Sequence, residues 1–154
     1  MLEVLDRDPS AQAAWWGQRR GRGWREGWWE KAGLEAAKAR AQLGERTCLE
    51  MLLEERFQLE FSREESTIGP LRLRARLNLK QRHLLVYEQG LADVGVALVR
   101  LGHPDVSPRD LVLAHETFHV LRPRCSQLYG ELAAHRFAGE VLGLPFFAGL
   151  VDCA

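Results

Sequence analysis

The chain has 154 residues, of which 46% are hydrophobic and 27% are charged. These values are typical of one globular domain, and they exclude a disordered chain, a collagen-like chain and an array of short repeats. The 21 basic residues equal the 21 acidic residues in number, so the formal net charge is zero. We therefore expect no general attraction to nucleic acids or to anionic membranes.

The three cysteines, Cys48, Cys125 and Cys153, have no CxxC spacing. They predict neither a disulfide framework nor a thiolate zinc site, and they favour a cytoplasmic location. The first ten residues lack the basic and apolar regions of an export signal, and no stretch approaches about 18 uninterrupted apolar residues. We expect neither export nor a membrane span.

Residues 1–30 form the first of two predicted parts, an arm rich in tryptophan and arginine. All five tryptophans lie there, interleaved with arginines and glycines. Arginines with aromatic rings can bind a nucleic-acid backbone, and tryptophan with arginine can hold a segment at a membrane interface. Because acidic residues balance the arginines, we favour a third interpretation, in which the indoles pack onto the core or onto a second subunit. We do not expect the arm to bind nucleic acid or a membrane.

Residues 31–154 form the second part, which we predict to be an α+β domain. The apolar positions from about residue 30 to residue 56 predict a long helix that is interrupted near Gly44. Apolar and polar residues alternate in segments 57–62 and 71–79, which predicts two strands. We expect segment 83–88 to be the third strand of a small antiparallel sheet. The last two strands are close enough to form a hairpin. Residues 91–101 predict a helix, or a strand followed by a helix.

The clearest helix start in the chain is at Ser107 and Pro108, a favoured N-cap followed by a favoured first helical residue. This helix is expected to end before Pro123, and a last helix to run from near Ser126 to about Gly143. The apolar residues after it can complete the core or form a dimer contact, and the sequence leaves the oligomeric state open: Leu144, Phe146, Phe147, Leu150 and Val151.

An HExxH motif at residues 115–119 lies inside this helix. His115 and His119 are four residues apart and share one helical face, so both imidazoles can bind one zinc ion. Glu116 can then face a water molecule on the zinc ion and act as its general base. Three protein ligands would leave the fourth position of the zinc ion open for that water.

The following helix offers two candidates for the third ligand, Glu131 and His135, which are again four residues apart. We favour Glu131, because a His-His-Glu set is a known catalytic zinc arrangement. His135 would then orient a ligand or stabilise the oxyanion, although a third histidine is an equally feasible ligand. Tyr129 can donate a hydrogen bond to a tetrahedral intermediate, but a tyrosine is more often a packing residue.

HExxH followed by residues 131–142 resembles the motifs of the ImmA/IrrE family of zinc metallopeptidases. The second motif of that family is ExxANxFAxxLLxP, and this chain matches it at Glu131, Ala134, Phe137 and Ala138, with His135 in place of the asparagine. The resemblance covers about residues 68–146. It implies a small zincin-like α+β domain of the gluzincin type, with a three-stranded sheet, an HExxH helix and a second helix that carries a ligand.

The resemblance also implies roles for the site residues. His115, His119 and Glu131 correspond to the zinc ligands of the family, and Glu116 corresponds to its general base. Characterised members of the family cleave transcriptional repressors, which implies a protein or peptide substrate such as a regulatory protein. The competing hypothesis is an inactive, metallopeptidase-like binding protein with a structural metal or none, whose arm contacts a partner protein or nucleic acid. A fourth protein ligand would favour that hypothesis, and an open position would favour catalysis.

Overall fold

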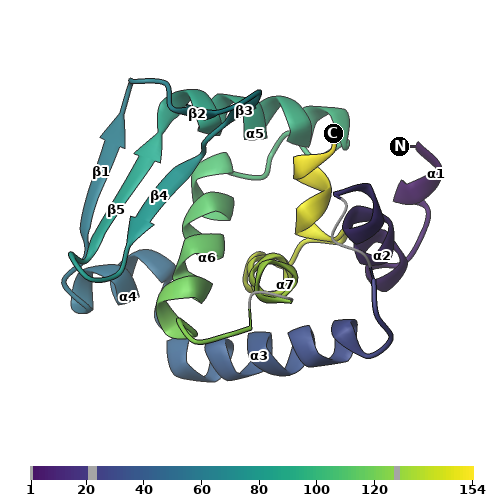
Figure 1. Cartoon of the computed structure of the whole chain (residues 1–154), viewed down its shortest axis with the longest axis horizontal. Coiled ribbons are helices and arrows are strands. Elements are labelled where there is room, and N and C mark those ends of the chain that lie inside the picture. The colour runs from purple at the N-terminus through teal and green to yellow at the C-terminus, as the bar shows by residue number, and fades with distance from the viewer. Residues whose placement is uncertain (1, 21–23, 127–128) are drawn as a thin grey trace.

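The structure is a computed structural model that describes residues 2–20, 24–126 and 129–154 (Figure 1). The predicted α+β class is confirmed. None of the helices in these ranges is both long enough and apolar enough to cross a membrane. The helices are α1 (Leu2–Leu5), α2 (Pro9–Arg19), α3 (Trp28–Leu43), α4 (Cys48–Glu54), α5 (Glu88–Arg100), α6 (Pro108–Leu121), α7 (Gly130–Leu142) and the 3₁₀ helix η1 (Ala148–Asp152). The strands are β1 (Gln58–Ser62), β2 (Thr67–Ile68), β3 (Leu71–Arg72), β4 (Ala75–Asn78) and β5 (His83–Tyr87).

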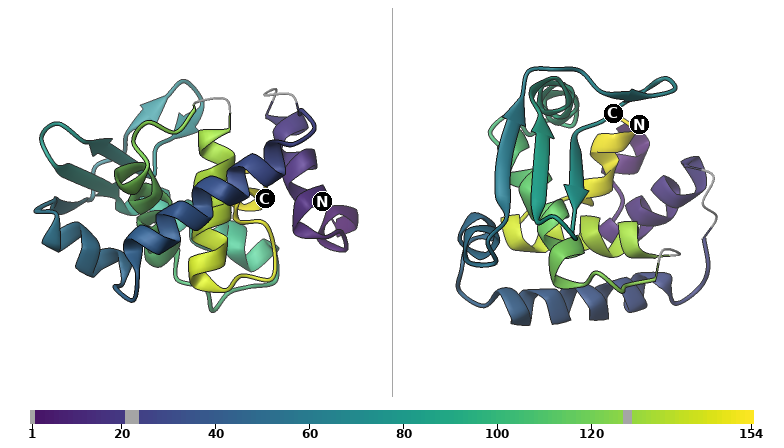
Figure 2. Two further views of the ribbon diagram at one scale, coloured as in Figure 1. Left: turned by 90° about the horizontal axis from the view of Figure 1, so that it is seen from below. Right: turned by 60° about the vertical axis from the view of Figure 1, so that its left-hand side comes forward.

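The main sheet has three strands in the order β1-β5-β4 (Figure 2). β4 and β5 form the predicted antiparallel hairpin, and Arg82 takes a left-handed conformation in its turn, with φ of 50°. β1 pairs with β5 in parallel, with Gln58 opposite His83, so the prediction of a fully antiparallel sheet is wrong. The chain runs back along β4 before it enters β5 between the two outer strands, and β5 therefore has the direction of β1.

The predicted strand at residues 71–79 is divided between two sheets. β3 pairs with β2 in a separate two-stranded hairpin, whereas β4 belongs to the main sheet. The backbone passes from one sheet to the other between Leu73 and Arg74. Leu73 N donates to Ser66 O at 2.7 Å, and Arg74 O accepts from Tyr87 N at 2.9 Å. Alternating polarity predicts strands but cannot show where a strand changes partner.

Two of the predicted helix signals are confirmed by the structure. The long helix of residues 30–56 is divided into α3 and α4 at Gly44, whose φ is 64°. Ser107 caps α6, because its Oγ accepts a hydrogen bond from Asp110 N at 3.2 Å. The helix expected in segment 91–101 is α5, which begins directly after β5 and contains no strand.

The last long helix ends at Gly143 as predicted, with φ of 64°, but it begins at Gly130 and not near Ser126. Cys125 N donates to Arg122 O at 3.1 Å in the turn that follows α6, and α7 runs across α6 rather than back along it (Figure 1). Residues 127–128, which fall within the predicted helix, lie outside the described ranges.

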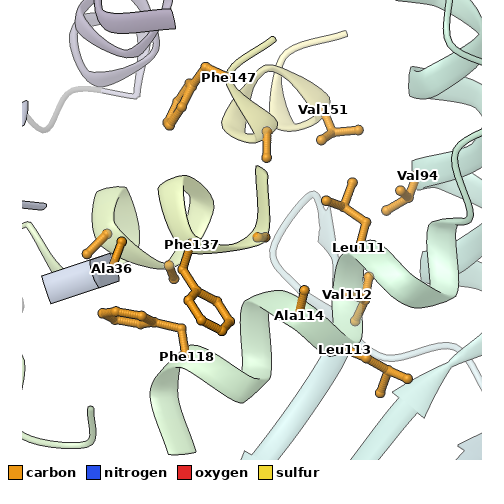
Figure 3. Packing of buried hydrophobic residues seen from close by; sticks show 14 of the residues in the cluster. Ala36, Val94, Leu111, Val112, Leu113, Ala114, Phe118, Phe137, Phe147 and Val151 are labelled. Atoms are coloured by element: carbon orange, nitrogen blue, oxygen red, sulfur yellow. The ribbon is translucent and has the colours of Figure 1, made fainter. Parts of the chain in front are cut away.

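The core lies between the sheet and the helices, with α7 at its centre (Figure 1). Phe118 of α6 and Phe137 of α7 are fully buried, and their ring centroids are 5.9 Å apart (Figure 3). Ala36 of α3 lies beside them, and such small residues allow α3 to approach α7 closely. η1 closes the other side of α7, where Phe147 and Val151 are buried. The apolar residues that follow α7 therefore contribute to the core.

The first helices are joined to the end of the chain by two buried side chains. Gln12 of α2 is 1% exposed; its Nε2 donates to Arg7 O at 3.0 Å and its Oε1 accepts from Phe147 N at 2.8 Å. Trp16 is 3% exposed, and its Nε1 donates to Asp152 Oδ2 at 3.0 Å. One amide and one indole thus fix α2 to the segment that contains η1.

We expect Gln12→Ala to lower the free energy of unfolding by about 2–3 kcal/mol, because it leaves the buried Phe147 N–H without its acceptor. Urea denaturation of the purified protein measures this loss. Gln18→Ala is the matched control, since Gln18 lies on the same helix but is exposed, and it should cost less than about 0.5 kcal/mol. Equal losses in the two variants would show that the Gln12 amide does not join the segments.

Candidate metal centre

The HExxH helix and the next helix bring three predicted ligands together. His115 and His119 lie one turn apart on α6 and face Glu131 in the first turn of α7. His115 Nε2 lies 3.1 Å from Glu131 Oε2, and His119 Nε2 lies 3.0 Å from Glu131 Oε1. The two imidazole nitrogens are 3.3 Å apart. Within the described residues, these three side chains form a group that can hold a metal ion.

The spacing of these ligand atoms fits a tetrahedral metal. Atoms bound about 2.1 Å from a tetrahedral zinc ion lie about 3.4 Å from one another. The two imidazole nitrogens, 3.3 Å apart, are close to this value, and each lies 3.0–3.1 Å from a different oxygen of the Glu131 carboxylate. Taken as one ligand atom per residue, the three donors lie within 4.8 Å of one another. Two imidazole nitrogens and one carboxylate form a donor set that zinc accepts, as do several other divalent ions. The donor set and its compactness therefore suit a divalent metal.

The charges within the group favour the ionised form of Glu131. Burial by itself would raise the pKa of Glu131, but hydrogen bonds from His115 and His119 and their charges hold it far below its usual range. Burial would likewise lower the pKa of His115, but Glu131 outweighs this effect and the pKa is raised. Glu131 is therefore a carboxylate, the form that binds a metal, whereas the raised pKa of His115 favours a proton on its ring that a metal would have to displace.

A cleft of about 290 Å³ opens beside the group. Its described lining includes His115, Glu116 and Glu131 together with residues 71–75 of the β3–β4 segment. Glu116, the predicted general base, thus lies in the same cleft as two of the ligands. Tyr129 directly precedes α7 and packs half-buried against the core; neither it nor His119 belongs to the described lining.

His135 lies beside His115 and outside the group of three. The centroids of the two imidazole rings are 4.5 Å apart, and His135 Nε2 lies 3.2 Å from Asp152 Oδ2. The side chain of His135 is 8% exposed, and the rings of Trp16 and Phe147 contact it at centroid distances of 5.3 and 5.7 Å. His135 also belongs to the described lining of the cleft, and its ring lies against that of His115.

Asp152 is the residue of this region that the sequence motifs did not indicate. It accepts hydrogen bonds from Trp16 Nε1 at 3.0 Å and from Arg74 Nη1 at 2.6 Å, and it also faces His135. Burial would raise its pKa, but the charges of His135 and Arg74 and the bond from Trp16 hold that pKa far below its usual range. One sequence signal was present, because a single acid in the apolar segment 144–153 requires a partner if it is buried.

The wall of the cleft depends on Gly90 of α5. A Cβ atom at Gly90 would lie 2.5 Å from Leu73 O and 2.6 Å from Arg74 Cα, both of them backbone atoms of the cleft wall. The backbone can lie this close to α5 only because residue 90 has no side chain.

Gly90→Ala is expected to lower the free energy of unfolding by about 2 kcal/mol, because the new methyl group forces the backbone of the cleft wall to move. Gly95→Ala on the same helix is the control. A Cβ there has only Pro108 Cγ nearby, at 3.6 Å, so alanine should stabilise the helix by about 0.5–1 kcal/mol. Thermal or urea denaturation measures whether each variant is less or more stable than the wild type. A gain of stability in both variants would contradict the close approach of the cleft wall to Gly90.

No protein-family model, curated protein or solved structure matches the chain. The resemblance to the ImmA/IrrE family therefore stays a prediction from the motifs. The arrangement of the site residues themselves carries the functional interpretation.

Proposed function

We propose that the chain is a zinc-dependent metallopeptidase of the gluzincin type, similar to the ImmA/IrrE family, with a protein or peptide substrate such as a regulatory protein. One observation carries the proposal. The imidazole nitrogens of His115 and His119 lie 3.3 Å apart and 3.0–3.1 Å from the two oxygens of the Glu131 carboxylate, and Glu116 lines the adjoining cleft. This is the constellation that hydrolysis by a metal-activated water requires.

Each residue has a distinct role in the proposed reaction. His115, His119 and Glu131 would hold a zinc ion, which supplies Lewis-acid activation of water and of the scissile carbonyl when bound. Glu116 takes a proton from the attacking water and passes it to the leaving amine. His135 lies beside Asp152 and packs its ring against that of His115, which would restrict the orientation of this ligand.

The position of the sheet supports a peptide as the substrate. β4 is an edge strand, with β5 on one side and no further described strand on the other. Its first residue, Ala75, and the two residues before it line the cleft beside Glu116. An extended peptide can pair its backbone with such an edge, which would place its carbonyl groups along the cleft.

The competing hypothesis, a binding protein with a structural metal, calls for a fourth protein ligand. In the part of the chain that the structure describes, the metal-binding group contains three residues. The other candidate, His135, has its Nε2 beside Asp152 at 3.2 Å. This arrangement favours an open fourth position and so supports the catalytic interpretation.

Zinc stoichiometry tests the proposal. After incubation with equimolar zinc and removal of the excess, elemental analysis should find one zinc ion per chain in the wild type and none in His115→Ala. His103→Ala is the matched control and should keep the zinc ion, since His103 stacks on Phe146 with centroids 4.7 Å apart and is not a member of the group. A wild-type protein that binds no zinc would overturn the proposed function.

A further inference from the structure

Three arginines line the cleft beside the metal-binding group: Arg20, Arg72 and Arg74. They come from separate segments, since Arg20 follows α2, Arg72 ends β3 and Arg74 lies where the chain changes sheets. We call these three residues the arginine wall. A second hollow continues past Arg20 to Arg19 and Cys153. The three arginines thus share one cleft with His115 and Glu131 of the metal-binding group.

The arginine wall is more accessible than the acid next to it. The side chains of Arg20, Arg72 and Arg74 are 32%, 36% and 31% exposed, whereas that of Asp152, which also belongs to the described lining, is only 10% exposed. Of the other two acids of the lining, Glu131 pairs with His115 and His119, and no ion pair within the described residues joins it or Glu116 to the wall. A molecule that enters the cleft therefore meets exposed guanidinium groups.

The three arginines differ in how far their hydrogen-bonding capacity is used. Arg74 donates to Asp152 at 2.6 Å, and Arg72 pairs with Asp93 at 3.2 Å. Arg20 has one acidic neighbour within 4 Å among the described residues, Asp152, at 3.9 Å. This distance is too long for a hydrogen bond, so within the described residues the Arg20 guanidinium has no hydrogen-bond partner and can donate to a ligand.

We infer that the arginine wall binds a carboxylate of the substrate near the scissile bond, with Arg20 as its main donor. The inference rests on the proposed function and names its substrate class: peptides with an acidic side chain, or a free C-terminal carboxylate, at this end of the cleft. A guanidinium matches a carboxylate with two parallel hydrogen bonds, which gives geometric selectivity as well as attraction. Trp16 fixes α2 to Asp152, and the N-terminal arm thereby contributes to specificity.

Binding of zinc-directed probes to the full, zinc-loaded chain tests this inference without turnover. The probes are dipeptides capped at the N-terminus with a hydroxamate, which anchors on zinc. The neutral probe ends in an amidated glutamine, the side-chain acid probe in an amidated glutamate and the terminal acid probe in a glutamine with a free carboxylate. Calorimetry at low salt should show about tenfold tighter binding for at least one acid probe than for the neutral probe. The probe that gains affinity identifies the source of the carboxylate.

Two variants of Arg20 test whether this residue causes the preference for the acid probes. Arg20→Gln should remove most of the difference in affinity between acid and neutral probes, and Arg20→Lys should retain part of it. Arg76→Gln is the matched control, because Arg76 is exposed on β4 and does not belong to the described lining. It should leave the preference intact. Circular dichroism and zinc stoichiometry confirm that each variant is folded and loaded.

The experiment distinguishes a failure of this inference from a failure of the proposed function. If the chain holds one zinc ion and binds the neutral probe, but binds the acid probes no more tightly, the inference is overturned and the proposed function stands. A preference that persists in Arg20→Gln also overturns it. A chain that binds no zinc overturns the proposed function and the inference together.

Discussion

Glu116→Gln is expected to reduce peptide hydrolysis at least a hundredfold while one zinc ion per chain remains bound. Glutamine preserves the shape of the side chain in the cleft, but its amide cannot take a proton from water, and positioned proton transfer contributes about 10²–10⁴-fold to such reactions. Glu116 is not a member of the metal-binding group, so zinc binding should not change. The measurement is cleavage of a mixed peptide library, followed by mass spectrometry, together with zinc analysis of the same samples.

Glu64→Gln is the matched control for this prediction. Glu64 is exposed and lies between β1 and β2, away from the described lining of the cleft. It should retain wild-type hydrolysis. Undiminished cleavage by Glu116→Gln would show that another group acts as the base.

The second large effect, a loss of stability, is expected when Asp152 is replaced. Asp152→Asn should lower the free energy of unfolding by about 2–3 kcal/mol, because a neutral amide offers Trp16, Arg74 and His135 one acceptor oxygen in place of two charged ones. Urea denaturation at pH 7 in a chelating buffer measures the loss without a contribution from metal. Asp105→Asn changes an exposed acid and should cost less than about 0.5 kcal/mol.

The stability that Asp152→Asn loses should depend on pH in a defined direction. The pKa of Asp152 is lowered in the folded protein, so its charge stabilises the fold above about pH 4, the usual value for a free aspartate. As the pH falls below this value, the unfolded chain binds a proton before the folded chain does, and the wild type loses this stabilisation. The difference between wild type and Asp152→Asn should therefore be constant near neutral pH and shrink in acid. A difference that grows in acid would contradict the assignment.

The features that the sequence predicted correctly depend on residues that are close together in the chain. Ser107 and Pro108 mark the start of α6, and Gly44 and Gly143 mark helix ends, because capping and left-handed turns are local. The spacing of His115 and His119 likewise follows from one helical turn. Local signals are therefore sufficient to place the candidate ligands on two neighbouring helices.

The features that the sequence did not predict depend on distant contacts. The parallel pairing of β1 with β5 and the division of segment 71–79 are decided by which strands meet, and alternation of polarity is silent on that point. The position of Asp152 is decided by Trp16, Arg74 and His135, which lie on three different segments. A single acid in an apolar segment indicates that partners exist, but it does not identify them.

The bonds that join α2 to the end of the chain also bear on how the protein folds. Gln12 and Phe147 are 135 residues apart in sequence, and Trp16 and Asp152 are 136 apart. Closing loops of this length costs the most entropy, so we expect these contacts to form late. α6 and α7 are neighbours in sequence and can dock earlier. In this order of events, His115, His119 and Glu131 would come together before Arg20 reaches the cleft.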